Sequence, residues 1–383
     1  MLAALKSRRP LRPLCASFGI SRKTGYKWLA RHRRGGLAAL GDVSRRPRRC
    51  PRQKPARWKL AVARVRRARP SWGAKKIRVR LRQLYPHQRL PAVRTIARWL
   101  GQLALPGQRR QRARRGPARP HPGLTVPRRV HQVWTVDFKG WFRTADGVRQ
   151  EPLTVREAKS RCVLEIRLLS SQSDRLVRRA MARLFAREGL PQAIRVDQGS
   201  PFGGIGALGL SRLSVWWLRL GIRVEFTRRA RPGDNAAHEQ LHRCYKAEVL
   251  ATPAADRHSA QRRSDRWRRD YNENRPHEAL GQKPPAQCWR PNPRRLPARL
   301  PALVYPPGLL LRRVRPHGEI KWQGRLRFIG RAFVGQTLGL KISRAGHAAV
   351  FLGSVLIGEL HPPDLAGMRP ARWLRPPENP HQL

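Results

Sequence analysis

Charge is the feature of this sequence that most constrains its fold and its partners. Lys and Arg number 83 against 22 Asp and Glu, which gives a formal net charge of +61. The imbalance is greatest in residues 1–130, where Asp42 is the single acid. Such a charge cannot be neutralised within the chain, so we infer that the partner is a nucleic acid. Hydrophobic residues make up 40% of the chain, which is enough for packed cores and indicates a globular protein.

Simple features exclude several other classes. No apolar run reaches about 18 residues, so no membrane-spanning helix and no membrane partner are expected. Apolar residues 2–5 precede the first basic residues, which is the reverse of the order in a signal peptide. The five cysteines show no paired spacing, so neither a zinc module nor a disulfide framework is indicated. We expect a reducing, cytoplasmic environment.

Residues 1–45 have the pattern of a helix-turn-helix DNA-binding domain. Two short helices are expected within 11–34, because Gly19 interrupts the first helical pattern and Ser21 is a good N-cap for the second. The second helix of such a motif enters a major groove. Its candidate DNA-contacting residues are Arg22, Lys23 and Lys27. A small helical hairpin with solvated charges is the alternative.

Two basic linkers flank a second helical module. Residues 46–55 are a Pro- and Arg-rich linker, and Arg45 and Arg46 at its start are further candidate DNA contacts. Residues 56–106 predict a second helical DNA-binding module, in which Trp72 is expected to fill the core. Residues 107–130 form an Arg/Pro linker.

From residue 131 the pattern changes to apolar runs that alternate with helical segments. This pattern predicts a central α/β core over 131–290. The expected strands are 133–138, 163–169, 193–197 and 222–226, and the expected helices are 213–220 and 236–250. Residues 310–362 contain several short β-like runs punctuated by glycines, which predicts a small β-barrel-like domain.

Three acids in the core occupy positions where apolar residues would be expected. Asp137 lies within an apolar strand, Asp197 ends another, and Glu239 lies near the start of a long helix. Each alone could be a cap or an ion pair. Three such acids in one α/β domain favour a shared site.

The helix that carries Glu239 adds basic residues near that acid. Glu239, either His242 or Arg243, and Lys246 follow spacings that place them on one outward face, opposite a packing face. Arg243 and Lys246 are therefore candidate contacts for DNA phosphates. Carboxylates are suitable ligands for two Mg²⁺ ions, which can activate an attacking oxygen and stabilise the leaving oxygen of a phosphodiester.

The segments around these acids resemble a known family. They are Trp134–Gly140, Asp197–Phe202, Gly209–Trp217, Arg231–Arg243 and Tyr271–Gly281, with Phe18–Leu29 upstream. In this order they resemble the bacterial insertion-sequence transposases of the DDE superfamily, whose catalytic core is of the retroviral integrase type. The resemblance implies a multidomain fold with N-terminal all-α helix-turn-helix modules and a central RNase H-like α/β catalytic core.

The resemblance also implies an activity. Asp137, Asp197 and Glu239 would be the catalytic triad and the ligands of two ions, Mg²⁺ or Mn²⁺. The enzyme would be a polynucleotidyl transferase that cleaves DNA at element ends and joins the freed 3′-hydroxyl to target DNA. Its partners would be double-stranded DNA, namely terminal inverted repeats and target, bound by a homo-oligomer in the bacterial nucleoid.

The sequence departs from the family pattern at three positions near the acids. Gln198 replaces the usual Asn, Ala236 replaces a Gly, and Glu157 stands where Asp is common. The N-terminus also leaves little room for a helix before residue 11. Two alternatives therefore stay open: a catalytically silent or domesticated helix-turn-helix regulator, and an RNase H-like nuclease without strand transfer.

Overall fold

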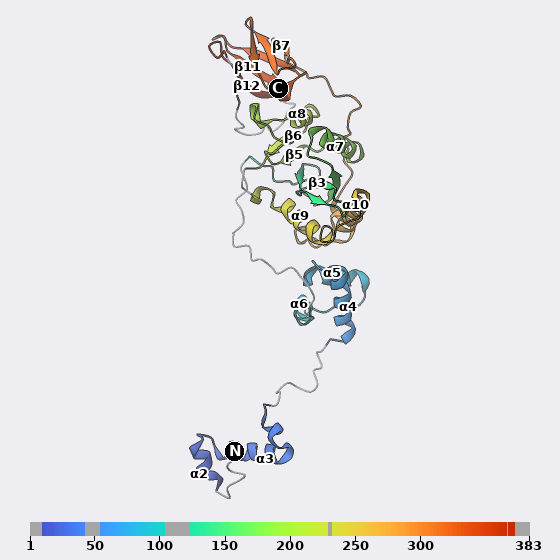
Figure 1. Ribbon diagram of the computed structural model, residues 1–383, viewed down its shortest axis with the longest axis vertical. Coiled ribbons are helices and arrows are strands. Elements are labelled where there is room, and N and C mark those ends of the chain that lie inside the picture. Colours follow the sequence, from blue (N-terminus) through green and yellow to red (C-terminus); the bar gives the residue numbers. More distant parts are fainter. Residues whose placement is uncertain (1–9, 43–53, 104–122, 229–231, 366, 372–383) are drawn as a thin grey trace. The chain divides into compact units, whose positions relative to one another are not determined.

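The computed structural model describes residues 10–42, 54–103, 123–228, 232–365 and 367–371 (Figure 1). The chain separates into two compact units, Met1–Ala56 and Arg57–Leu383. Among the residues that the structure describes, no helix combines the length and the apolar character needed to cross a membrane.

The first unit contains the two helices predicted from the sequence. Helix α2 (Leu11–Ser17) and helix α3 (Arg22–Gly35) are followed by the short helix η1 (Leu37–Leu40). The turn depends on Gly19, whose φ of 62° is a left-handed conformation that favours glycine. The Ser21 side chain accepts a hydrogen bond from the amide of Thr24 and caps α3, as the sequence predicts.

The second unit begins with three helices, α4 (Ala56–Ala68), α5 (Ala74–Leu84) and α6 (Val93–Gln102). They enclose their own apolar core, in which Trp58, Val62 and Ile77 are buried. Trp72 is 1% exposed and fills this core, so its predicted structural role is confirmed.

A mixed six-stranded sheet follows. Its strands are β1 (Val133–Phe138), β2 (Phe142–Arg143), β3 (Arg149–Glu157), β4 (Val163–Leu169), β5 (Ala193–Val196) and β6 (Arg223–Phe226). The order is β2-β3-β1-β5-β6, and β4 also pairs with β3. The pairs β1–β3 and β3–β4 are antiparallel, whereas β1–β5 and β5–β6 are parallel. The predicted α/β class of this region is confirmed.

Helices of this region are α7 (Asp174–Glu188), α8 (Arg212–Arg219), α9 (Ala236–Glu248), α10 (Arg257–Asn274) and α11 (Pro285–Cys288). Alternate residues of a strand face opposite sides of a sheet. Trp134 and Val136 of β1 therefore join the core that includes α7 and α8 residues. Thr135 and Asp137 face the other side, where Thr135 contacts α9.

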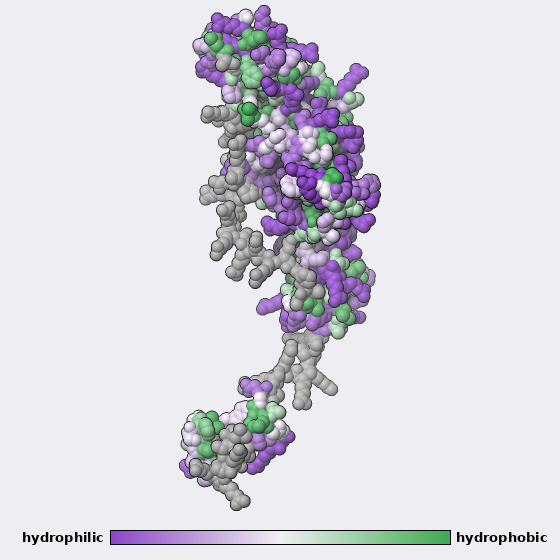
Figure 2. All heavy atoms as spheres, viewed as in Figure 1, coloured by the Kyte–Doolittle hydropathy of each residue, from purple (hydrophilic) through white to green (hydrophobic). Residues whose placement is uncertain are grey.

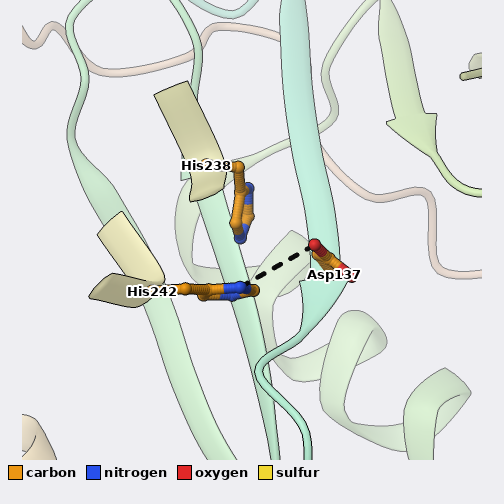
Figure 3. A group of neighbouring side chains, drawn as sticks. All are labelled: Asp137, His238 and His242. Carbon is orange, nitrogen blue, oxygen red and sulfur yellow. Dashed lines mark ion pairs between the residues drawn. The ribbon is translucent and has the colours of Figure 1, made fainter. Parts of the chain in front are cut away.

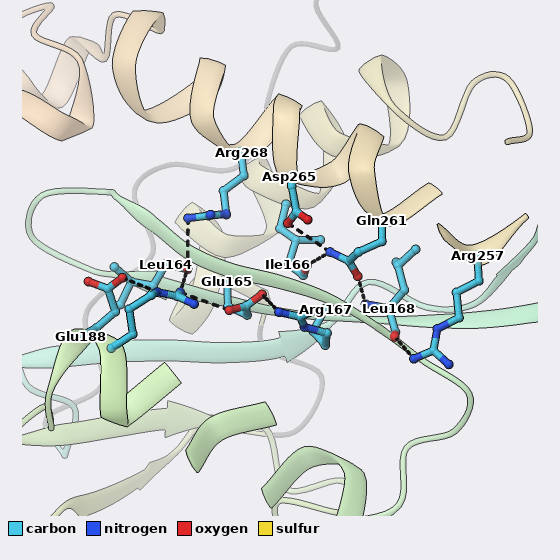
Figure 4. A network of polar contacts seen from close by, with 11 residues as sticks. Leu164, Glu165, Ile166, Arg167, Leu168, Glu188, Arg257, Gln261, Asp265 and Arg268 are labelled. Carbon is cyan, nitrogen blue, oxygen red and sulfur yellow. Dashed lines mark hydrogen bonds and ion pairs between the residues drawn. The ribbon is translucent and has the colours of Figure 1, made fainter. Parts of the chain in front are cut away.

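Helix α10 follows the outer edge of β4 and supplies the hydrogen bonds that a further strand would make (Figure 4). Gln261 accepts a hydrogen bond from the amide of Leu168 at 2.9 Å and donates one to the carbonyl of Ile166 at 2.8 Å. Asn272 pairs in the same way with both backbone groups of Val163, at 2.9 Å each. An open sheet edge is thereby closed by side chains of a helix.

The C-terminal part consists of two sheets. Strands β13 (Arg369–Pro370), β12 (Val355–Leu360), β11 (Ala348–Leu352), β10 (Thr337–Ile342) and β7 (Leu310–Arg313) form one, in that order. Strands β8 (Glu319–Trp322) and β9 (Arg325–Phe328) form a separate pair. The predicted barrel is not confirmed, because neither sheet closes on itself within the described residues.

This β-rich part shares an apolar core with the sheet-and-helix region. Ala207 and Leu208 in the short helix η2 (Ala207–Gly209), together with Leu210 and Val215, are buried in one cluster with the inward-facing residues of β10, β11 and β12. The segment that follows Asp197 in the chain is thus held by the C-terminal sheet.

Candidate active site

The sheet places the first two acids beside each other. Val133 of β1 pairs with Ala193 of β5 in parallel. The same register, carried four residues further, brings Asp137 and Asp197 to neighbouring positions at the ends of these strands. Asp137 is half-buried and Asp197, one residue beyond β5, is exposed.

Glu239 reaches the same place from α9. It lies in the first turn of that helix, and its side chain is exposed. Burial, together with the charges of Asp197 and Glu239, raises the pKa of Asp137 to about 7, against a hydrogen bond from the amide of Phe138 and the charge of Lys139. The charges of the other two carboxylates therefore act on Asp137.

The loop after Asp197 is fitted closely to that acid. The amide of Gly199 donates a hydrogen bond to Asp197 Oδ1 at 3.2 Å. A Cβ on Gly199 would lie 3.2 Å from Asp197 Oδ2, so a side chain there would press on the carboxylate. This close approach explains a glycine two residues after the acid.

Helix α9 divides its polar residues between two faces. Glu239, Arg243 and Lys246 are exposed, as the sequence predicts. His242 is buried and 5% exposed, so of the two alternatives it is Arg243 that shares the outward face. The reason is that Thr154 of β3 lies under the helix and offers His242 a polar partner.

A second histidine, missed by sequence reasoning, lies one turn earlier. His238 is fully buried and contacts Thr135 and Thr154 through its two ring nitrogens, at 2.7 Å each. Both histidines point from α9 toward Asp137 on β1 (Figure 3). His242 Nδ1 lies 3.8 Å from Asp137 Oδ2. A histidine pair at spacing four, on a face that otherwise carries Leu241 and Tyr245, was the signal available in the sequence.

Two other acids of this region, Glu157 and Asp234, have structural partners. Glu157 is fully buried and accepts hydrogen bonds from the amides of His131 and Lys159 and from the hydroxyl of Ser160. Asp234 accepts two hydrogen bonds from the guanidinium of Arg228. These carboxylates stabilise turns around the site.

The basic residues predicted to contact DNA lie at the surface wherever they are described. Arg22, Lys23 and Lys27 are exposed on α3, and Arg243 and Lys246 are exposed on α9. Arg45 and Arg46 lie outside the described residues. Hydrophilic side chains cover most of the face shown in Figure 2.

Comparisons with known families match two parts of the chain. The integrase core domain family matches residues 220–285, and a helix-turn-helix domain family matches residues 1–48. The class that the fold and the site define is therefore a protein with an integrase-type core joined to a helix-turn-helix domain.

Curated relatives narrow this class. An insertion element IS407 protein of 31.7 kDa from Burkholderia multivorans is 30% identical over 183 residues, which are 47% of this chain and 62% of that protein. An insertion element IS476 protein of 39.2 kDa from Xanthomonas euvesicatoria is 28% identical, over 47% of this chain and 50% of that protein. The chain thus spans between half and two thirds of these relatives. Over the matched part, the chain is similar to these insertion-element proteins.

Among solved structures, the chain matches the HTLV-2 integrase catalytic core domain in complex with magnesium. The match has 12% sequence identity and a TM-score of 0.32. It covers 43% of this chain and 99% of the integrase chain. A simian T-cell lymphotropic virus intasome in complex with a PP2A regulatory subunit has 14% identity and a TM-score of 0.35, over 81% of this chain and 95% of that one.

Proposed function

We propose that this protein is a transposase that cleaves DNA at the ends of its element and joins the freed 3′-hydroxyl to target DNA. The observation that supports this most strongly is the meeting of Asp137, Asp197 and Glu239. In a chain of net charge +61, the charges of Asp197 and Glu239 both act on Asp137, and such a group of acids favours a bound cation.

The donor set fits divalent metal ions. Carboxylate oxygens are the ligands that Mg²⁺ and Mn²⁺ accept most readily. The pKa of Asp137 is raised by burial and then by the charges of Asp197 and Glu239, and a bound cation would favour the ionised form of this acid. Asp137, Asp197 and Glu239 would hold the ions, two in number. When bound, such ions supply an activated attacking oxygen and charge neutralisation at the leaving oxygen.

The basic residues would then position the substrate. Arg243 and Lys246 project from α9 one and two turns beyond Glu239, where they can contact the phosphates that flank the scissile bond. Arg22, Lys23 and Lys27 on α3 would read or anchor the terminal repeats through a major groove. The DNA-bound protein would act as a homo-oligomer.

The experiment is cleavage and strand transfer by the full chain on an oligonucleotide duplex that carries the inverted repeats of the flanking genomic DNA. Asp137→Asn, Asp197→Asn and Glu239→Gln should each abolish both reactions while DNA binding is retained. Gln240→Ala, an exposed neighbour on the same helix, is the matched control and should remain active. Strand transfer by the Glu239→Gln protein would refute the triad.

A further inference from the structure

Four side chains form a buried chain of hydrogen bonds beneath the acids. Thr135 of β1 contacts His238 Nδ1 at 2.7 Å, and His238 Nε2 contacts Thr154 of β3 at 2.7 Å. The Thr154 hydroxyl also lies 2.8 Å from His242 Nε2 and 2.9 Å from the carbonyl oxygen of Asp137. All four residues are less than 9% exposed. The chain therefore links α9 to two strands of the sheet without water.

The Thr154 hydroxyl determines where the protons lie. A hydroxyl has one hydrogen and two lone pairs, and its three contacts use all of them. A backbone carbonyl can only accept, so the hydroxyl donates to the carbonyl of Asp137. The Nε2 atoms of His238 and His242 must then both donate to Thr154.

The same logic completes the chain at Thr135. His238 has its proton on Nε2, because the contact with Thr154 requires that atom to donate. With a proton on Nε2, its Nδ1 accepts from the Thr135 hydroxyl at 2.7 Å. The Thr135 hydroxyl also donates toward the carbonyl of Arg156 at 3.3 Å, so its single hydrogen is shared between these two acceptors. Both ring nitrogens of His238 are thereby occupied.

His242 is left with one free ring atom. Its proton is on Nε2, and Nδ1 carries an unshared electron pair 3.8 Å from Asp137 Oδ2. Two atoms that each present an unshared electron pair do not attract each other directly. Ligand atoms about 2.1 Å from one ion lie roughly 3.0–3.5 Å apart, so a small side-chain adjustment lets these two share a cation.

We propose that His242 is a metal ligand at the acid site, through Nδ1, and that His238, Thr154 and Thr135 are positioning residues that hold its ring. This inference deepens the proposed function and rests on it. A nitrogen ligand beside carboxylates favours first-row transition ions such as Mn²⁺ over Mg²⁺, which prefers oxygen. His238 contacts Thr135 and Thr154 through both nitrogens and is excluded as a ligand, although it lies in the same cluster.

The decisive variant is His242→Gln, measured in the full chain. A glutamine amide can keep the contact with Thr154 but offers no atom at the Nδ1 position. We expect the affinity for Mn²⁺, measured by the electron paramagnetic resonance signal of free Mn²⁺, to fall about tenfold or more, which is the cost of losing one good ligand. The affinity for Mg²⁺, measured by competition, should fall less. Gln240→Ala should bind both ions as the unchanged protein does.

A measurement on the unchanged protein avoids dependence on the folding of any variant. Pulsed electron paramagnetic resonance of the Mn²⁺-loaded chain should show ¹⁴N modulation from an imidazole, and its absence would overturn the assignment. Mn²⁺ affinity that is unchanged in His242→Gln but lost in Asp137→Asn would also make His242 purely structural. If Asp137→Asn itself binds Mn²⁺ normally, the proposed function fails first, because the ion is then not at the acids.

Discussion

At the scale of single residues, Asp137 makes the metal-free site costly to fold. Its pKa in the folded chain is about 7, raised by burial and by the charges of Asp197 and Glu239. Below about pH 4 the group is protonated whether or not the chain is folded, so it then has no effect. As the pH rises from about 4 to 7, the unfolded chain loses this proton first, and stability falls.

The substitution Asp137→Asn removes that ionisation. We expect the metal-free variant to be more stable than the unchanged protein at pH 8, by about 1–3 kcal/mol, and equal to it at pH 4. Thermal unfolding in a metal chelator at the two pH values measures the difference. Equal stability at pH 8 would mean that the three acids do not strain the folded state.

His242 titrates with the opposite sign. Its pKa falls to about 3 in the folded chain, because burial and the charge of Lys139 disfavour its cationic form. The unfolded chain binds this proton at a higher pH, so stability rises from about pH 3 to 6.5. His242→Gln should therefore remove a rise of stability with pH, whereas Asp137→Asn should remove a fall over a largely overlapping pH range. Chemical unfolding at intervals of half a pH unit separates the two.

Lys246 tests the phosphate contacts. It is exposed on α9, on the face that carries Glu239. Lys246→Ala should weaken binding to all duplexes alike and reduce the slope of log affinity against log salt by roughly one unit. A titration of binding against ionic strength gives the slope. An altered choice of element end would instead indicate that Lys246 reads bases.

At the scale of elements, α10 holds the β4 edge by polar contacts. Gln261 satisfies one backbone amide and one backbone carbonyl of β4 at once. Gln261→Leu should leave both groups without protein partners and lower the free energy of unfolding by about 1–3 kcal/mol. Arg262→Ala, which alters an exposed neighbour on the same helix, is the control. It should lower the free energy of unfolding by less than about 0.5 kcal/mol, as is usual for an exposed residue. Denaturant unfolding of both proteins decides the matter.

The same helix shows where sequence reasoning fails. Strands β1, β4 and β5 and helices α3, α8 and α9 were predictable, because apolar spacing and caps define them locally. Helix α10 has few apolar residues, with Trp267 and Tyr271 among its buried side chains. It is held by side chains that form hydrogen bonds with the backbone of a strand distant in sequence. No residue spacing within the helix predicts such a partner. Helix α7, by contrast, buries Val177, Met181 and Leu184 at helical spacing. This helix was therefore predictable from the sequence, although it is not among the helices predicted above.

The candidate site divides in the same way. The three acids could be located because each lies at a strand end or helix start within a resembling segment. The role of the histidine pair could not be predicted, because the role of a histidine on a buried helix face depends on which side chains of other elements lie beneath it. Here those side chains are Thr135 of β1 and Thr154 of β3. Their pairing with α9 follows from the register of the whole sheet.

At the scale of the whole molecule, end recognition and chemistry should be separable. Arg22, Lys23 and Lys27 lie in the first compact unit, and the acids lie in the second. We expect their joint replacement by alanine in the full chain to abolish the preference for element ends over scrambled duplex, while metal-dependent nicking of arbitrary DNA persists. A competition binding assay at fixed ionic strength, paired with a nicking assay, tests this. Full preference in the triple variant would place recognition elsewhere.

The C-terminal sheet cannot be separated so simply. Leu208 and Leu210, which follow Asp197 in the chain, are buried in one core with β10, β11 and β12. A copy of the gene interrupted by a stop codon between residues 291 and 309 would leave these leucines uncovered and the loop beside Asp197 without support. Such a copy would keep the intact first unit, occupy the ends and not cut them. Under the proposed function, loss of about the last quarter of the reading frame would thus turn an active element into the source of its own repressor, and damaged copies in a genome would silence the intact ones.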